Sequence, residues 1–282
     1  MRNVIWIRKP ISPTTKVAAT LLFIAIVFGV WFLLTSPLSS PENRTISRNV
    51  LPNPVDIVRS FPALIRGTPE VGAFEWKKSL LFATWLSFKR EFISFLIVLM
   101  IALPLGIFMS CQKAIKSFFY PMLVVGTFIP IAALIPLTQA IFGIEEKQKI
   151  IFLTLGMFFV ALGLVIKEME EVDDIYLQTA YTLGFSQLKS IFLVNFPIAL
   201  PRIWKHFSSV FGLGWGYIIF AEMVNSSGGD TVNGIGWLFI SRQRRFQIED
   251  MYAIFFVIIL FAFLFSWLFK LLGNTVFKHE KV

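Results

Sequence analysis

Long runs of apolar residues dominate the hydrophobic pattern of this chain. Several span roughly 18 residues or more, enough for a helix rising about 1.5 Å per residue to cross a hydrocarbon core of about 30 Å. A transmembrane barrel would show alternating segments of about ten residues instead. The pattern predicts an all-α polytopic membrane protein with about six transmembrane helices, at residues 17–34, 92–108, 118–143, 150–166, 203–223 and 252–272.

The polar segments between these runs divide the chain into regions. The first run follows basic residues, as in a secretory signal or a membrane anchor, and its length and the lack of a small-x-small cleavage site favour the anchor. After it, Val55, Val58 and Phe61 recur at helical spacing, as in an amphipathic helix on the membrane surface. The predicted regions are a cytoplasmic end at 1–16, a first helix at 17–34, a periplasmic segment at 35–91, a five-helix core at 92–272 and a cytoplasmic tail at 273–282.

Lysine and arginine residues indicate the orientation of the chain. With the N-terminus inside, thirteen of the 26 lie in cytoplasmic segments and thirteen outside. Long segments cross the membrane largely regardless of charge, so the six basic residues of the first outer segment, through Lys78, carry less weight, and thirteen remain against seven. Both termini and the segment 167–202 are therefore predicted to be cytoplasmic.

Composition narrows the class of protein further. Hydrophobic residues make up 56% of the chain and charged residues 15%, which lies outside the range of soluble domains. The net charge of +9 is spread over loops and helix ends, so anionic membrane lipid is the expected partner rather than nucleic acid. Cys111 is the only cysteine and ends an apolar run, which suits a packing residue and excludes an internal disulfide.

The stretch from Asp173 to Gly184 predicts a short amphipathic helix between two apolar runs. Asp173 or Asp174 can cap its start, and Gly184 suits a left-handed residue at its end. Its apolar face consists of Tyr176, Ala180 and Leu183.

A second short helix is predicted directly after the glycine. Ser186 can cap it, and its periodic positions are Leu188, Ile191, Phe192 and Asn195. Pro197 and Pro201 are expected to end it. Together the two helices present an apolar ridge and a fixed corner to the cytoplasm, so we expect a partner to dock there.

These residues resemble the EAA loop of binding-protein-dependent ABC importer permeases. That motif reads E-A-A, three residues, glycine, nine residues and I-x-L-P. Here Gln178, Thr179 and Ala180 stand at E-A-A, Gly184 at the glycine, and Val194 to Pro197, which include Phe196, at I-x-L-P. Both spacings are intact. Gln178 in place of Glu removes an ionic contact at the first position but leaves the helix–glycine–helix shape.

Other fragments are similar to the nitrate/sulfonate/taurine branch of the same family. They are "LPNPVDIV", "ALPLGIFMS", "IPIAALIPLTQAIFGI", "ALPRI" and "AEMVNSSGG…GIGWLF", in the same order over roughly residues 50–272. The resemblance implies a type I ABC importer permease fold, with a swapped-in first helix around five core spans. It also implies a small, anionic or zwitterionic solute.

The same resemblance implies the partners of the chain. Two permease subunits, either two copies or a copy and a paralogue, would pair, and a periplasmic or lipid-anchored binding protein would deliver the solute. The EAA loop of each would sit in a groove of an ATPase subunit. The coupling residues carried over are Asp174, Gln178, Thr179, Ala180, Gly184, Val194, Phe196 and Pro197.

No motif for catalysis is found in the sequence. G-x-x-x-x-G-K-[ST] is missing, so ATP and Mg²⁺ are expected on a separate subunit, with no cofactor bound here. His206 and His279 have no cysteine or carboxylate at metal-ligand spacing, and neither G-x-S-x-G nor H-E-x-x-H occurs. We therefore expect a transport subunit that is not an enzyme.

Several residues are candidates for a translocation path or gate. Pro130 and Pro136, with Pro121, must kink or break the third run, and such backbone usually lines a cavity. Glu222 near the outer end of the fifth run either serves function or caps the following helix. Gly212, Gly214 and Gly216 favour close helix packing over substrate contact. The path candidates are Pro130, Pro136, Gln139, Trp215, Tyr217 and Glu222, although core- or lipid-facing positions fit them equally.

Two other functions fit the broken third run or the docking loop. An ATP-independent secondary transporter or channel also uses broken helices, but it needs no coupling loop and usually shows inverted repeats, which we do not find. A membrane scaffold for a soluble enzyme has no need of a proline-broken span.

Overall fold

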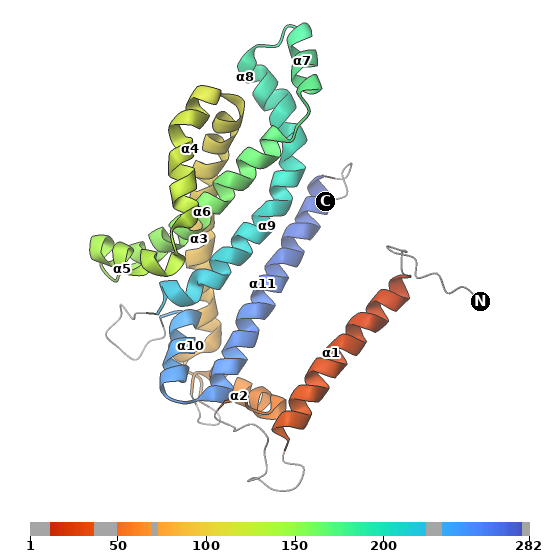
Figure 1. Cartoon of the computed structure of the whole chain (residues 1–282). Helices are drawn as coiled ribbons and strands as arrows, with labels where there is room; N and C mark the ends of the chain where they lie inside the picture. The colour runs from red at the N-terminus through yellow and green to blue at the C-terminus, as the bar shows by residue number, and fades with distance from the viewer. Residues whose placement is uncertain (1–11, 37–49, 69–72, 224–232, 278–282) are drawn as a thin grey trace, which may run out of the picture.

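The computed structural model describes residues 12–36, 50–68, 73–223 and 233–277. All regular elements of these residues are helical, which confirms the all-α prediction (Figure 1). The α-helices are α1 (Pro13–Thr35), α2 (Pro54–Arg66), α3 (Leu80–Cys111), α4 (Lys113–Phe128), α5 (Ile131–Phe142), α6 (Glu146–Glu170), α7 (Asp174–Thr182), α8 (Gln187–Ser190), α9 (Phe196–Ala221), α10 (Ile235–Arg244) and α11 (Ile248–Val276). A 3₁₀ turn at Trp76–Lys78 precedes α3, and a π-turn at Ile191–Asn195 joins α8 to α9. His279 and parts of the two predicted cytoplasmic ends lie outside the described residues.

Four of the described helices are long and apolar enough to cross a membrane, namely α1, α3, α6 and α11. The pair α4 and α5 makes a fifth if it counts as one broken span. The fifth predicted span, at residues 203–223, lies in α9, which is helical but is not apolar enough to be counted. Its three glycines, its serines and the pair Lys205 and His206 lower its hydropathy. α9 packs on α6 and α11, and its buried side chains include Val210, Phe211 and Ile218.

The third predicted span is broken, as its prolines indicated. The axes of α4 and α5 differ by 106°, and α5 turns away from the direction of α4 (Figure 1). The break lies at Pro130, because the residue before a proline is forced into extended backbone, and Ile129 has a ψ of 118°. Pro121 and Pro136 lie inside α4 and α5 without ending them.

α6 runs through the middle of the bundle between α3 and α9 (Figure 1). Its side chains Phe152, Leu153 and Met157 are fully buried. α11 packs on the far side of α9, where the ring of Phe211 lies 5.8 Å from Phe269. Ring pairs of this kind add about 0.5–1.5 kcal/mol beyond their buried area.

α3 begins twelve residues before the span predicted at residue 92. The side chain of Ser79 caps it by accepting a hydrogen bond from the Phe82 N–H at 3.2 Å. Ser87, Arg90 and Glu91 interrupt the apolar run, and for this reason the predicted start of the span fell too late in the sequence. In the structure these three side chains are buried against other helices instead of facing lipid or water.

The amphipathic helix predicted before α3 is present as α2, but its buried face differs from the predicted one. Ile57 and Leu64 are buried and Phe61 is partly buried, whereas Val55 and Val58 are exposed. Ile57, Phe61 and Leu64 follow the i, i+4, i+7 spacing of one helix face. That face packs on α11 and α3, while Val55 and Val58 of the predicted membrane-facing set remain uncovered by the described part of the chain.

α1 stands apart from the bundle and touches it near its last turn (Figure 1). There the Trp31 indole stacks on Phe256 with ring centroids 5.9 Å apart, and its Nε1–H donates to the Pro52 carbonyl at 3.0 Å. Thr35 is the one buried residue of the helix. The remaining apolar surface of α1 is uncovered by the described part of this chain.

Candidate functional site

α7 and α8 form a corner that projects from one end of the molecule (Figure 1). The Asp173 carboxylate caps α7 by accepting from the Ile175 N–H at 3.0 Å, which confirms the predicted start. At the other end the Gly184 N–H donates to the Tyr181 carbonyl and the Phe185 N–H donates to the Ala180 carbonyl, both at 3.0 Å. These two bonds define a Schellman motif, which needs a left-handed residue at its centre. Gly184 has a φ of +81°, as predicted.

α8 does not end where the prediction placed its end. The chain passes from α8 through the π-turn directly into α9, so Pro197 and Pro201 lie inside a continuing helix. Pro197 lies just after the π-turn and, inside this continuous helix, has no N–H to donate to the preceding turn. Pro201 removes one backbone bond from the helix interior. Ser186 stands at the predicted capping position, but its side chain makes no capping bond.

The apolar ridge predicted for this corner is exposed. We call Ile175, Tyr176, Tyr181, Leu183 and Leu188 the coupling ridge, and each of these side chains is about half exposed or more, Leu183 the most at 71%. Three of the predicted ridge positions are not exposed, since Ala180, Ile191 and Asn195 are buried at 3%, 6% and 4% exposure. Several large apolar side chains gathered on one corner mark a surface that another molecule covers.

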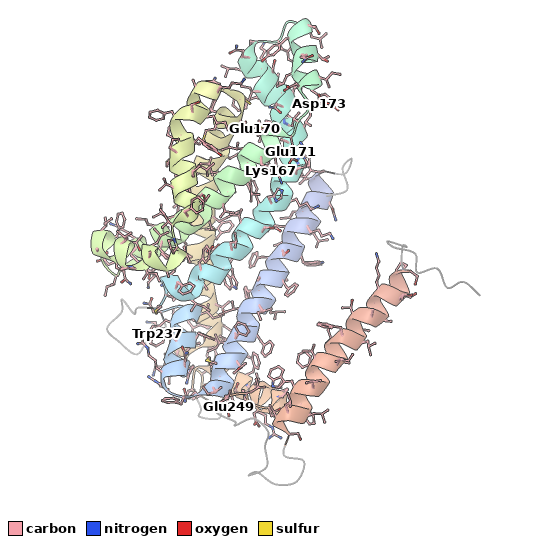
Figure 2. The ribbon with its side chains drawn as sticks, viewed as in Figure 1. Lys167, Glu170, Glu171, Asp173, Trp237 and Glu249 are labelled. Atoms are coloured by element: carbon pink, nitrogen blue, oxygen red, sulfur yellow. The ribbon has the colours of Figure 1, made fainter. Side chains whose placement is uncertain are left out.

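Acidic residues surround the base of the corner. Lys167, Glu170, Glu171 and Asp173 are grouped where α6 ends and α7 begins, whereas Trp237 and Glu249 lie at the opposite end (Figure 2). Lys116 on α4 pairs with Glu170 at 2.6 Å. Beneath the corner lies a cavity of about 370 Å³, bounded by residues of α3, α6, α7 and the π-turn. The corner thus follows directly on α6 and has a cavity beneath it.

A buried network of charges lies toward the other end of the bundle, centred on Arg90 of α3. Its guanidinium donates through all five N–H groups. Two bonds reach the Glu146 carboxylate at 2.5 and 2.7 Å, one reaches Glu222 at 2.5 Å, and two reach the carbonyl and side-chain oxygens of Asn233 at 2.7 and 3.0 Å. Lys149 of α6 also donates to Asn233, at 2.8 Å. The network joins α3, α6 and α9 to the start of α10.

Glu222 is fully buried at 0% exposure and caps α10 from outside that helix. Its carboxylate accepts from the Gly236 N–H at 2.8 Å and from the Ser87 hydroxyl at 2.7 Å, while the Ser87 oxygen accepts from the Ile235 N–H at 2.8 Å. A carboxylate at a helix N-terminus is favoured by the helix dipole. This is the capping alternative for Glu222, although residues 226–229 of the adjoining turn lie outside the described residues.

Comparison with known protein families shows to which family this chain belongs. The family described as "Binding-protein-dependent transport system inner membrane component" matches residues 98–278, which include the α7–α8 corner and most of the bundle. This chain belongs to that family. It is a multi-pass inner membrane permease subunit of a binding-protein-dependent ABC transport system, and its role is transport rather than ATP hydrolysis. Such a permease works with ATPase and binding-protein partners.

Known permeases resemble the chain over most of its length. A Bacillus subtilis protein named as the aliphatic sulfonates transport permease SsuC is 26% identical over 233 residues, which cover 83% of this chain and 77% of SsuC. The Escherichia coli taurine transport system permease protein TauC is 23% identical over 263 residues, covering 93% of this chain and 89% of TauC. The E. coli protein named SsuC is 32% identical over 136 residues, about half of each chain.

The structure does not gather the predicted path residues of this permease into one place. Trp215 is 1% exposed, donates to the Ile258 carbonyl at 2.8 Å and stacks on Phe261, so it faces α11. Tyr217 packs beside Gly156 on α6. Gln139 is partly buried, while Pro130 at the α4–α5 break and Pro136 inside α5 are exposed.

Residues that sequence reasoning missed lie just before the predicted second span. Ser87, Arg90 and Glu91 were assigned to the periplasmic segment, yet all three are buried and two belong to the charge network. The signal that could have found them is an Arg–Glu pair in a sequence that is otherwise apolar and helical. Among the described residues, no group of three or more His, Cys, Asp or Glu side chains is placed to hold a metal ion.

Proposed function

We propose that this permease passes a small anionic or zwitterionic solute of the sulfonate class from a binding protein to the cytoplasm. The α7–α8 corner carries the proposal, because its exposed coupling ridge and firmly capped helix suit a joint to an ATPase subunit. The substrate class comes from the relatives named for aliphatic sulfonates and taurine. The binding protein is periplasmic or lipid-anchored, and ATP and Mg²⁺ act on the ATPase subunits.

The coupling joint is proposed to be the whole motif-bearing segment. Gly184 holds the angle of the corner, and Gln178 and Thr179 lie exposed on α7 where a partner reaches them. The full set is Asp174, Gln178, Thr179, Ala180, Gly184, Val194, Phe196 and Pro197. Since α8 continues through the π-turn into α9, a displacement of the corner is transmitted to α9 and, through the α6–α7 connection, to α6.

The proposed orientation places the corner and both termini in the cytoplasm. α1 begins, and α11 ends, toward the end of the molecule that carries α7 and α8 (Figure 1). This arrangement supports the orientation inferred from the lysine and arginine residues. The charge network around Arg90 then lies toward the outer side.

A second permease subunit, as a copy or a paralogue, is proposed to complete the transporter. The uncovered surface of α1 supports this, because an isolated apolar helix needs a partner other than its own bundle. An apolar groove of about 470 Å³ between α2, α3 and α11 is lined by residues that include Trp85, Phe88 and Leu260. The swapped-in first helix of one subunit is proposed to pack near this groove of the other. Pro130, Pro136, Gln139 and Tyr217 remain proposed path or gate residues.

The test is purification of the solubilised permease with its ATPase subunits, comparing the native chain with Gly184→Val. A β-branched residue disfavours the left-handed backbone at this position, while no neighbouring atom lies within 4 Å of the added Cβ. We expect the native chain to bring down an ATP-hydrolysing subunit and to support taurine or alkanesulfonate uptake. Gly184→Val should lose uptake while still inserting in the membrane.

Gly143→Val is the matched control, because Gly143 also has a positive φ of 73° and no atom within 4 Å of an added Cβ. It lies between α5 and α6, away from the corner. Full uptake by Gly184→Val at normal protein levels would contradict the coupling role. A native chain that transports without any ATPase subunit would favour the ATP-independent transporter instead.

A further inference from the structure

Glu91 of α3 is an ionisable residue to which neither the coupling joint nor the charge network gives a role. Its side chain is 0% exposed, and neither carboxyl oxygen has a hydrogen-bond partner among the residues that the structure describes. α9 passes it at Gly214, where an added Cβ would overlap Glu91 Oε1 and would lie 2.5 Å from Met157 Sδ of α6. The carboxyl group is therefore enclosed by α3, α6 and α9 at their closest approach.

The cationic side chains near Glu91 donate their hydrogen bonds to other residues. All five N–H groups of Arg90 donate to Glu146, Glu222 and Asn233. Lys149 of α6 donates to Glu146 and Asn233. The hydroxyl of Ser94, one turn along α3, donates to the Arg90 and Ile150 carbonyls. No described donor remains for Glu91.

The remaining charges do not favour an ionised Glu91 either. Glu222 at the end of α9 is the acidic group whose charge acts on Glu91, and it opposes a second negative charge there. Arg242 of α10 and Asp250 of α11 pair with each other at 3.4 Å. At the other end of α9 and α6, His206 and Glu168 likewise pair with each other, at 2.8 Å.

An ionised carboxylate in such a place would lose its hydration and gain neither a cation nor a hydrogen bond. A protonated carboxyl group carries no net charge and is tolerated far better in the same space. The enclosed, unpartnered position of Glu91 therefore favours the neutral carboxyl group over the carboxylate. Gly214 is what leaves room for it, since any side chain there would displace the carboxyl group.

We propose that Glu91 is a proton-binding site that links the conformational cycle of the permease to pH. It holds one proton in the packed conformation and releases it to solvent in a conformation where α3 and α9 separate at Gly214 and water reaches the carboxyl group. The proton is taken up from solvent again when the helices close. This link rests on the proposed ATPase-driven displacement of α6 and α9, whereas the bound proton in the packed conformation does not.

The sign of the pH effect follows from linkage. The packed conformation binds the proton more tightly, so acid favours it, and rising pH favours the conformation in which Glu91 is wetted and ionised. In the pH range between the proton-binding midpoints of the two conformations, the equilibrium constant between them changes by up to about tenfold for each pH unit. A neutral side chain of the same shape, such as glutamine, removes this dependence.

The first experiment reads the proton directly, by infrared spectroscopy of the purified permease–ATPase complex in lipid nanodiscs. We expect the native complex to show the C=O stretching band of a protonated carboxyl group, shifted in D₂O, and Glu91→Gln to lack it. Glu171→Gln, at an exposed position, is the control and should keep the band. Identical spectra for the native complex and Glu91→Gln would overturn the proposal.

The second experiment measures ATP-driven uptake of taurine or an alkanesulfonate into vesicles between about pH 6 and pH 8. We expect the native complex to change its rate severalfold over this range, and Glu91→Gln to retain uptake with a flat profile. Superimposed native and variant profiles would overturn the link to the cycle. If Glu91→Gln fails to accumulate, Glu91→Leu takes its place, and the D₂O-sensitive band of the native complex still decides whether the proton is bound. A carboxyl band without any uptake would refute the proposed function and leave the proton site standing.

Discussion

At the scale of single residues, this permease is organised by buried polar groups that need specific partners. Arg90 holds two carboxylates and an asparagine together, and Glu222 and Ser87 satisfy the first N–H groups of α10. Removing one partner of such a set leaves an uncompensated buried charge, which is far more costly than replacing the set with apolar residues. The loss of stability on replacing one of these residues therefore depends on which partners are left without a hydrogen bond or an opposite charge.

Arg90→Met is expected to lower the stability of the detergent-solubilised permease by about 3–5 kcal/mol, because it leaves the fully buried Glu222 carboxylate without its paired cation. The double variant Arg90→Met/Glu222→Met should recover part of that loss. Thermal unfolding followed by a fluorescent reporter measures both. A double variant less stable than Arg90→Met would show that the network is not the cause.

Gly214→Ala is expected to destabilise the permease by about 1–3 kcal/mol through overpacking against Glu91. Gly212→Ala is the matched control, because no atom lies within 4 Å of a Cβ at residue 212 on the same helix. Thermal unfolding of the two variants should differ clearly. Equal midpoints would mean that α9 does not pack on Glu91 as described.

At the scale of elements, the α7–α8 corner combines local capping with an exposed apolar surface. The Schellman motif at Gly184 and the cap at Asp173 need no distant residue, and the coupling ridge faces outward. α5 and α9 behave differently. Their directions depend on the break at Pro130 and on the π-turn, which allows α8 to continue into α9 despite Pro197 and Pro201.

Leu183→Asp is expected to reduce recovery of the ATPase subunit at least tenfold with little change in permease stability, because Leu183 is exposed on the coupling ridge. Val58→Asp, an exposed apolar position on α2, is the control for adding a charge outside the corner. Co-purification followed by quantitative mass spectrometry compares the two. Equal recovery in both variants would place the ATPase contact elsewhere.

At the scale of the whole molecule, the bundle is well packed at its centre but incomplete at its edge. α6 buries its side chains against α3 and α9, whereas α1 leaves most of its apolar surface uncovered. A groove of about 470 Å³ between α2, α3 and α11 is also uncovered. These features support the second permease subunit proposed above.

A cysteine scan over one turn of α1 around Leu22, paired with a cysteine at Leu260 in the groove, is expected to give cross-linked permease dimers. Both positions are exposed in the single chain. The scan requires Cys111→Ser first, since Cys111 is the native cysteine. Cross-linked products separate by size on denaturing gels. If every position gives only uncross-linked monomer in membranes that support uptake, the exchanged first helix would be wrong.

The sequence by itself determined the membrane class, the broken third span and the shape of the α7–α8 corner. Each depends on signals within a few residues, such as helical spacing, capping side chains, Gly184 and the position of a proline. The start of α3, the buried face of α2 and the roles of Ser87, Arg90 and Glu222 came only from the tertiary structure. Whether a polar residue in an apolar helix ends a span or lies buried depends on partners more than fifty residues away, such as Glu146 and Asn233 for Arg90. The hydrophobic pattern within a few residues does not identify those partners, because they are distant in the sequence and come together only in the folded chain.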